Sequence, residues 1–133
     1  MKKVLFVCVG NSARSQMAEA FFNHWAKGAA QAVSAGTEPA GGLAAGIAEA
    51  MRELGIDMRA HHPKQLSDEL TAGAERIITM GCGVSCPVGI RIDEDWGLDD
   101  PAGQPLAQVR ATRDAIARRV KLLLEQLGIP AVD

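Results

Sequence analysis

The sequence predicts an α/β fold in which helices cover both faces of a parallel sheet. Stretches with strand character alternate along the chain with stretches of helical periodicity, as they do in βαβ units. The first stretch, 2–8, is a short apolar and β-branched run that ends at a Gly-Asn turn signal, which is typical of a fully buried strand. Ligands of such sheets bind at the carboxyl ends of the strands, and Cys8 stands at one of these ends.

The second and third elements follow from apolar spacing and from end signals. A helix is expected to begin with Ser15 as its N-cap and to stop at Gly28, because Met17, Phe21 and Trp25 lie along one stripe. A short strand is expected at 32–35. The Gly- and Ala-rich composition of the wider stretch 28–46 predicts a mobile loop around it.

Three further elements complete the pattern. A helix over 43–54 is indicated by apolar residues at helical spacing and by the closing Gly55. The apolar run 76–80 predicts a third strand. A long C-terminal helix is expected over 104–127, with Pro105 near its first turn and Gly128 just beyond its end.

Composition narrows the class of protein before any motif is considered. The 133 residues suit one domain, 1–133, and the near balance of 14 Lys and Arg against 16 Asp and Glu disfavours a nucleic-acid partner. The apolar run 4–9 is too short for a signal sequence or a membrane span, so a soluble, cytoplasmic protein is expected. Three cysteines in such a chain suggest reactive thiols, since a disulfide framework is improbable there.

The loop after the first strand has the spacing of an oxyanion-binding cradle. Five residues separate Cys8 from Arg14, which is enough chain to wrap backbone N–H groups around a tetrahedral anion. The start of the following helix adds its positive dipole end, and Arg14 supplies a bidentate fork. These positive surroundings favour the nucleophilic thiolate of Cys8. The predicted oxyanion-binding residues are Val9, Gly10, Asn11, Ser12, Ala13, Arg14 and Ser15.

The residues of the loop allow two alternatives to the cradle. Cys8 can be a buried core residue while Arg14 is a solvated helix charge. Nucleotide-binding phosphate loops are disfavoured, because the glycines that their motifs require are missing between Cys8 and Ser15.

Asp100 is the predicted general acid. It lies in the loop before the last helix and immediately precedes the rigid Pro101, a position from which a carboxyl group can overhang the anion. The alternative is structural, because Asp-Pro pairs are common turn formers.

Cys82 and Cys86 form a second chemical element just after the third strand. Only three residues separate them, and glycines flank the pair. A zinc site would need four ligands, and the remaining candidates form no second paired motif, so neither a metal nor a cofactor is expected. In the redox interpretation, Cys82 attacks a sulfur bonded to the substrate and Cys86 relays the disulfide outward by thiol exchange.

Taken together, these motifs and their order resemble the arsenate reductases of the low-molecular-weight tyrosine phosphatase superfamily. The resemblance covers nearly the whole chain and rests on the loop Cys8–Ser15 with the following 16–19, on Ser34–Thr37, Leu54–Asp57, the pair Cys82 and Cys86, and Trp96–Pro101. It implies a three-layer sandwich with a central four-stranded parallel sheet. There are two departures, the short spacer between Cys82 and Cys86 and an alanine at position 13, where relatives often have cysteine.

The resemblance also implies a reaction. Cys8 would attack arsenate, Arg14 and the loop amides would hold its oxygens, and Asp100 would protonate the departing oxygen. Cys82 would then displace arsenite, and a Cys82–Cys86 disulfide would be reduced by thioredoxin or another thiol reductant. Phosphate and sulfate would compete for the site, and a monomer is expected.

Two other functions remain open. The first is a hydrolase of phosphotyrosine or of small phosphomonoesters, which would use the same cradle, nucleophile and acid. The absence of tyrosine and of aromatic residues after Pro101 counts against it. The second is a thiol sensor that traps arsenite or a soft metal without turnover. The segment 61–64, His-His-Pro-Lys, is expected to be a solvated loop. The resemblance offers an alternative, because some relatives have a serine-lysine segment at this place, and Lys64 would then add positive field at Cys8.

Overall fold

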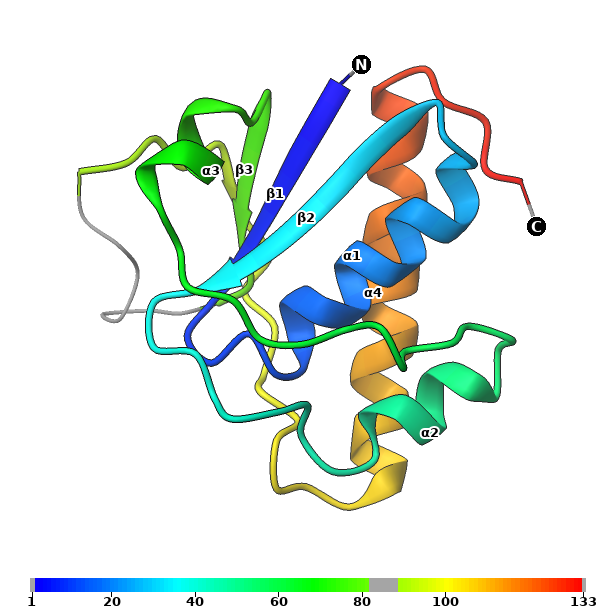
Figure 1. The fold of residues 1–133 in the computed structure, drawn as a ribbon. Helices are drawn as coiled ribbons and strands as arrows, with labels where there is room; N and C mark the ends of the chain where they lie inside the picture. The colour runs from blue at the N-terminus through cyan, green and yellow to red at the C-terminus, as the bar shows by residue number, and fades with distance from the viewer. Residues whose placement is uncertain (1, 82–88, 133) are drawn as a thin grey trace.

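The computed structural model describes residues 2–81 and 89–132. Strands and helices alternate along this part of the chain, as the sequence predicts (Figure 1). In chain order the elements are β1 (Lys2–Cys8), α1 (Arg14–Ala26), β2 (Ala30–Gly36), α2 (Ile47–Arg52), α3 (Asp68–Ala72), β3 (Arg76–Thr79), β4 (Glu94–Asp95) and α4 (Leu106–Gln126).

The strands form a four-stranded sheet with the order β2-β1-β3-β4, and all three pairings are parallel. Cys8 at the end of β1 is opposite Gly36 at the end of β2, and Val7 is opposite Thr79 at the end of β3. Three carboxyl ends therefore meet at one edge of the sheet. The predicted four-stranded parallel sheet is confirmed.

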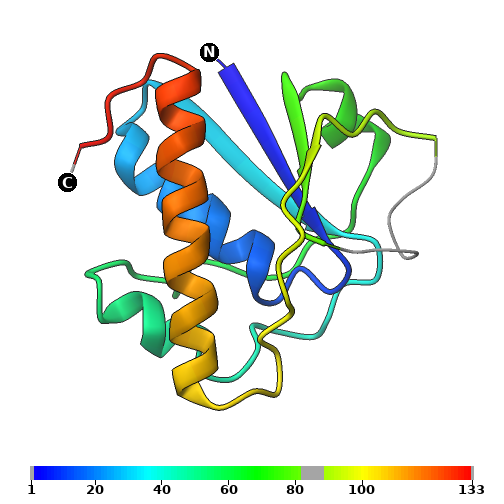
Figure 2. The ribbon, with the colours of Figure 1, turned by 180° about the vertical axis from the view of Figure 1, so that it is seen from behind.

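Alternating side chains of β1 divide the molecule into three layers. Val4 and Phe6 belong to the large core shared with α1, α2 and α4, whereas Leu5 and Val7 belong to a smaller core that Leu70 of α3 covers. Figures 1 and 2 show α1 and α4 together on one side of the sheet and α3 on the other. This division is the period-2 alternation of a strand that is buried on both faces.

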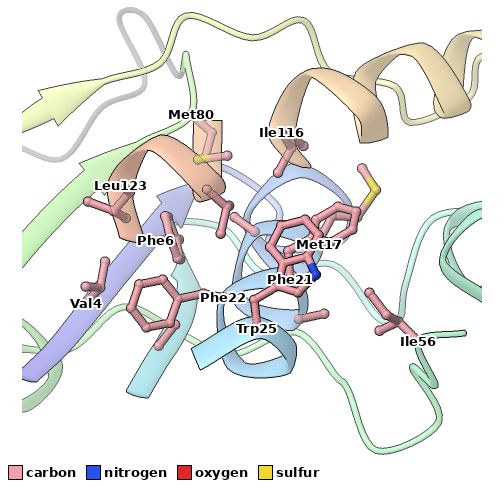
Figure 3. Packing of buried hydrophobic residues seen from close by; sticks show 14 of the residues in the cluster. Val4, Phe6, Met17, Phe21, Phe22, Trp25, Ile56, Met80, Ile116 and Leu123 are labelled. Carbon is pink, nitrogen blue, oxygen red and sulfur yellow. The ribbon is translucent and has the colours of Figure 1, made fainter. Parts of the chain in front are cut away.

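Aromatic rings fill the larger core (Figure 3). The rings of Phe6 and Phe22 meet edge to face with their centroids 6.3 Å apart. The ring of Phe6 also packs against Trp96, with 5.4 Å between the ring centroids. Phe21 and Trp25, both on α1 and both buried, are stacked with their ring centroids 4.9 Å apart. This packing fixes α1, and hence its N-terminal end, against β1.

Two helix boundaries differ from the sequence prediction. Helix α1 begins at Arg14, so Ser15 is not its N-cap but a fully buried residue of its first turn. Helix α2 is shorter than the predicted 43–54, because Gly46 has a left-handed backbone with a φ of 85°. A residue in that conformation cannot continue a right-handed helix, so α2 starts at Ile47.

The structure contains two short elements that the sequence does not predict, α3 and β4. Helix α3 has only five residues, and the hydroxyl of its N-cap residue, Ser67, accepts a hydrogen bond from Leu70 N. Strand β4 has two residues, both acidic, and therefore carries no apolar pattern. Neither element is long enough to produce a period. Among the described residues, no helix has the length and apolar character needed to cross a membrane.

Glu53, at the end of α2, joins that helix to α4. Its carboxylate accepts hydrogen bonds from Arg110 at 2.7 Å and from Arg113 at 2.7 Å. The hydrogen bond from Arg110, followed by the one from Arg113, lowers the pKa of Glu53 from 4.5 to about 2. A lowered pKa in the folded state means that the ionised carboxylate stabilises the fold.

We therefore expect Glu53→Gln to lower the thermal midpoint in a pH-dependent way. The stabilisation by Glu53 is complete above its unfolded pKa of about 4.5 and disappears as the pH falls through about 2. Melting curves of both proteins between pH 2 and 7 should show a gap that is constant near neutrality and closes in acid. If the difference in thermal midpoint between the two proteins stays unchanged in acid, the substitution acts by altering the packing at position 53 and not by removing the negative charge.

Candidate active site

Cys8 lies where β1 ends, and the loop 9–13 leads from it directly into α1 (Figure 1). The cysteine is 3% exposed. Because the loop returns the chain to the start of α1, the sulfur lies near the positive end of the helix dipole. The arrangement is the predicted sequence of strand, tight loop and helix.

The outer side of the loop is anchored by the segment that follows β2. Glu38 N donates to the carbonyl of Val9 at 2.9 Å, and Ala40 N donates to that of Gly10 at 2.9 Å. Ala44 N donates likewise to the carbonyl of Ser12. These bonds hold three loop carbonyls on the side of 38–44, so this segment is a wall of the cradle and not the independent mobile loop that its composition predicted.

Gly36 permits this close contact. A Cβ atom at this position would lie 2.5 Å from Val9 O and 3.0 Å from Asn11 N. Because backbone atoms cannot yield as a side chain can, a larger residue would push the loop off β2. The need for glycine at position 36 is set by the tertiary packing of the loop.

The Cys8 sulfur has two polar neighbours. Asn11 N donates to it at 3.1 Å, and Ser15 Oγ lies 2.8 Å away. Asn11 itself has a left-handed backbone with a φ of 50°, a conformation that asparagine tolerates better than most residues. This turn of the backbone brings the Asn11 N–H back onto the sulfur.

The side chain of Asn11 fixes the direction of the hydrogen bonds. Its Oδ1 accepts from Lys64 N at 2.9 Å and from Gln16 Nε2 at 3.0 Å, so its Nδ2 is the atom that faces Ser15 Oγ, at 2.7 Å. Since an amide nitrogen can only donate, Ser15 Oγ accepts there and turns its own hydrogen toward Cys8 Sγ. Both polar neighbours of the sulfur are therefore hydrogen-bond donors.

The segment 61–64 braces this network, contrary to the expectation of a solvated loop. Gln16 is fully buried; its Nε2 donates to His62 O at 2.8 Å, and its Oε1 lies 3.0 Å from His61 Nδ1. The charge of Lys64 is paired with Glu19, at 3.7 Å, and its backbone N–H supports Asn11. Lys64 thus contributes through its backbone.

Arg14 is 5% exposed, so it is not a solvated helix charge. Its Nη1 donates to Met80 O at 2.8 Å and to Leu98 O at 2.9 Å. Its Nε has no hydrogen-bond partner among the described residues. The guanidinium is therefore held by carbonyls on one edge, while other N–H groups remain for an anion beside Cys8.

Asp100 lies at the edge of the site. Its Oδ2 is 3.8 Å from Arg14 Nη2, its Oδ1 accepts from Ala102 N at 3.0 Å, and its side chain is 54% exposed. The structure thus brings Cys8, Arg14 and Asp100 into one region. Cys82 and Cys86, the two remaining predicted thiols, lie outside the described residues. In 2–81 and 89–132, no group of three or more His, Cys, Asp and Glu side chains is arranged to hold a metal ion.

Sequence reasoning missed several residues that build the site: Gln16, Gly36, His61 and the backbone of Lys64. Gln16 directly follows the cradle motif 8–15, and this position, the third residue of α1, was the available signal. The role of Gly36 and of 61–64 depends on long-range contacts that leave no local pattern.

The arrangement is suited to nucleophilic attack on a tetrahedral oxyanion. A sulfur held by two donors, a helix N-terminus, a buried guanidinium and a carboxyl group 3.8 Å from that guanidinium are groups that such a reaction can use. Comparison with known proteins agrees with this chemistry. Residues 3–85 match the family model of low molecular weight phosphotyrosine protein phosphatases.

The names of individual relatives are more specific than the name of the family. The glutaredoxin arsenate reductase of Synechocystis is 37% identical, over 96% of this chain and 100% of its own length. The solved structure of an arsenate reductase in the phosphate binding state superposes with a TM-score of 0.85 at 36% identity, covering 95% of this chain and 98% of that one. A thioredoxin-dependent arsenate reductase of Corynebacterium glutamicum has a TM-score of 0.80 at 30% identity, covering 96% of this chain and 62% of the other. The chain belongs to the low molecular weight phosphotyrosine protein phosphatase family.

Proposed function

We propose that this chain is an arsenate reductase that converts arsenate to arsenite with the three thiols of Cys8, Cys82 and Cys86. One observation carries the proposal: a buried cysteine held by two donors, in a cradle closed by Arg14, belongs to a chain with two further cysteines three residues apart. The relatives named as arsenate reductases match over nearly the whole chain, which supports the same substrate.

The first step is attack of the Cys8 thiolate on arsenic. An arsenic–sulfur bond forms and one arsenic–oxygen bond breaks. The departing oxygen takes a proton from Asp100 and leaves as water, while Arg14 and the loop amides from Val9 to Ser15 hold the remaining oxygens. Phosphate and sulfate have the same shape and charge, so we expect them to compete.

The second and third steps move two electrons to arsenic and renew the nucleophile. The Cys82 thiolate attacks the Cys8 sulfur, the sulfur–arsenic bond breaks, and its electron pair stays on arsenic, which leaves as arsenite. The Cys86 thiolate then attacks Cys82 and releases Cys8. The resulting Cys82–Cys86 disulfide takes two electrons from thioredoxin or another thiol reductant.

Hydrolysis of phosphomonoesters is the second candidate, since the matching family is named for phosphatases. The cradle suits both reactions, but hydrolysis uses neither Cys82 nor Cys86. Substitution of these two thiols therefore separates the functions.

In the wild type, we expect one equivalent of arsenate to leave a Cys82–Cys86 disulfide. In Cys86→Ser, one turnover should remain and should end in a trapped Cys8–Cys82 disulfide. In Cys82→Ser, release of arsenite should fall below one equivalent. Peptide mapping by mass spectrometry identifies each disulfide, and Ser85→Ala is the matched control, because it alters the same segment without removing a thiol.

Repeated turnover of the wild type without either disulfide would contradict the relay, because an external thiol would then attack the Cys8 adduct directly. The reductant is tested in parallel by arsenate-dependent NADPH oxidation. Thioredoxin with its reductase is compared with glutaredoxin and glutathione at equal enzyme concentration. We further propose that residues 1–133 act as a single domain, as a monomer, in the reducing cytoplasm that free thiols require.

A further inference from the structure

The residue immediately before Cys82 is held in an unusual position. Gly81 has a left-handed backbone with a φ of 95°. A Cβ atom there would lie 2.8 Å from Leu98 O and 2.9 Å from Leu98 N. The chain therefore leaves β3 in close contact with the backbone of the loop that carries Asp100.

One carboxylate oxygen holds this position. Asp95 Oδ1, at the end of β4, accepts from Gly81 N at 2.7 Å and from Thr79 Oγ1 at 2.7 Å. Thr79 is fully buried, and its carbonyl also accepts from Trp96 N at 2.9 Å. A single side chain on the edge strand thus ties the end of β3 to the residue that precedes Cys82.

The same stretch is tied to the oxyanion site from the other side. Met80 N donates to Val7 O on β1 at 3.0 Å, and Arg14 donates to the carbonyls of Met80 and Leu98. Because Met80 and Gly81 are held both from β1 and from β4, the starting point of the thiol segment is fixed relative to Cys8. Asp95 is not a partner of Cys8 or Arg14 in any hydrogen bond or ion pair of the described residues.

We infer that Asp95 is a positioning residue for the second thiol: it orients Gly81, and through Gly81 the attachment of Cys82, for attack on the Cys8 adduct. This inference rests on the proposed function, because it assigns Asp95 to the step in which Cys82 displaces arsenite. The step forms the Cys8–Cys82 bond and breaks the sulfur–arsenic bond. Asp95 takes no part in holding the oxyanion.

The test compares two carboxylates that bind β3 in the same manner. Asp93 Oδ2 accepts from Ile77 N at 2.8 Å, so Asp93→Ala removes a similar carboxylate bond from the same strand, away from Gly81. Both Asp95→Ala and Asp93→Ala are made in the Cys86→Ser background. Rapid quenching with an alkylating reagent, followed by peptide mapping, then gives the rate of Cys8–Cys82 disulfide formation after addition of arsenate.

We expect Asp95→Ala to slow formation of this disulfide about 10- to 100-fold, the range that follows from a small misplacement of a reacting group. The affinity for inorganic phosphate, measured by calorimetry, should stay within about twofold, since the cradle is intact. Asp95→Asn keeps one acceptor oxygen and should give an intermediate rate. Asp93→Ala should change neither quantity, although both alanine variants are expected to melt earlier than the parent.

Three results would overturn the inference. An unchanged disulfide rate in Asp95→Ala would show that Gly81 needs no such anchor. A parallel loss of phosphate affinity would show that Asp95 supports the oxyanion site as a whole. An equal slowing in Asp93→Ala would show that the slower disulfide formation comes from a general weakening of β3 and is not specific to Asp95. Failure of the proposed function is distinguishable from all three, since the parent Cys86→Ser would then form no Cys8–Cys82 disulfide.

Discussion

Cys8→Ser should abolish arsenate reduction, because it removes the group that attacks arsenic. The hydroxyl of serine is hardly ionised at neutral pH, so it is a much weaker nucleophile than the sulfur that it replaces. Steady-state assays with arsenate and any small aryl phosphate should both fall to background. Turnover that persists in the purified variant would assign the nucleophile to another thiol.

The control for this substitution is the integrity of the site. Serine is close to cysteine in size, and position 8 is 3% exposed, so the fold should tolerate the change. Phosphate should still bind, since the loop amides and Arg14 are unaltered. Loss of both phosphate binding and thermal stability would show that the cradle has collapsed. The lost activity would then not identify Cys8 as the nucleophile.

Asp100→Asn should slow the chemical step by roughly 10²- to 10⁴-fold, the usual contribution of a positioned general acid. The amide cannot donate the proton that the departing oxygen needs, but it keeps the size of the side chain and its acceptor oxygen for Ala102 N. We therefore expect kcat to fall while the affinity for phosphate changes little. Single-turnover kinetics with arsenate measure the step directly.

Asp99→Asn is the matched control, because Asp99 is an exposed carboxylate one residue away. It should leave the rate of the chemical step unchanged. If Asp100→Asn instead weakens phosphate binding at an unchanged rate, Asp100 acts by holding the Arg14 guanidinium, whose Nη2 lies 3.8 Å from its carboxylate. Its role would then be structural.

The fold could be predicted from the sequence wherever an element is long and its pattern is regular. The buried run 2–8 and the long helix near 104–127 are found almost at their predicted bounds, since burial on both faces and a sustained apolar stripe leave a clear local signal. Helix α2 was predicted too long because the apolar stripe continues through Gly46, where only the backbone conformation interrupts the helix. Strand β4 has too few residues to show any pattern.

The residues that carry out the chemistry could be predicted from the sequence more easily than the residues that hold them in place. Cys8 and Arg14 belong to a short motif whose spacing reflects the size of an anion. Both residues can therefore be identified from the local sequence alone. The roles of Gly36 and of the Lys64 backbone were missed because their contacts with the loop join residues far apart in sequence. The same is true of Asp95, whose bond to Gly81 spans fourteen positions along the chain.

The long-range bracing of Asn11 also bears on when the nucleophile becomes reactive. Cys8 is among the first residues of this sequence to be synthesised, whereas Lys64 and the segment 38–44, which hold its loop, follow later in the chain. A nascent chain that ends before Lys64 lacks one of the two donors that orient the Asn11 amide toward Ser15. The hydrogen-bond network around the Cys8 sulfur is therefore completed only after both β1 and β2 have been made.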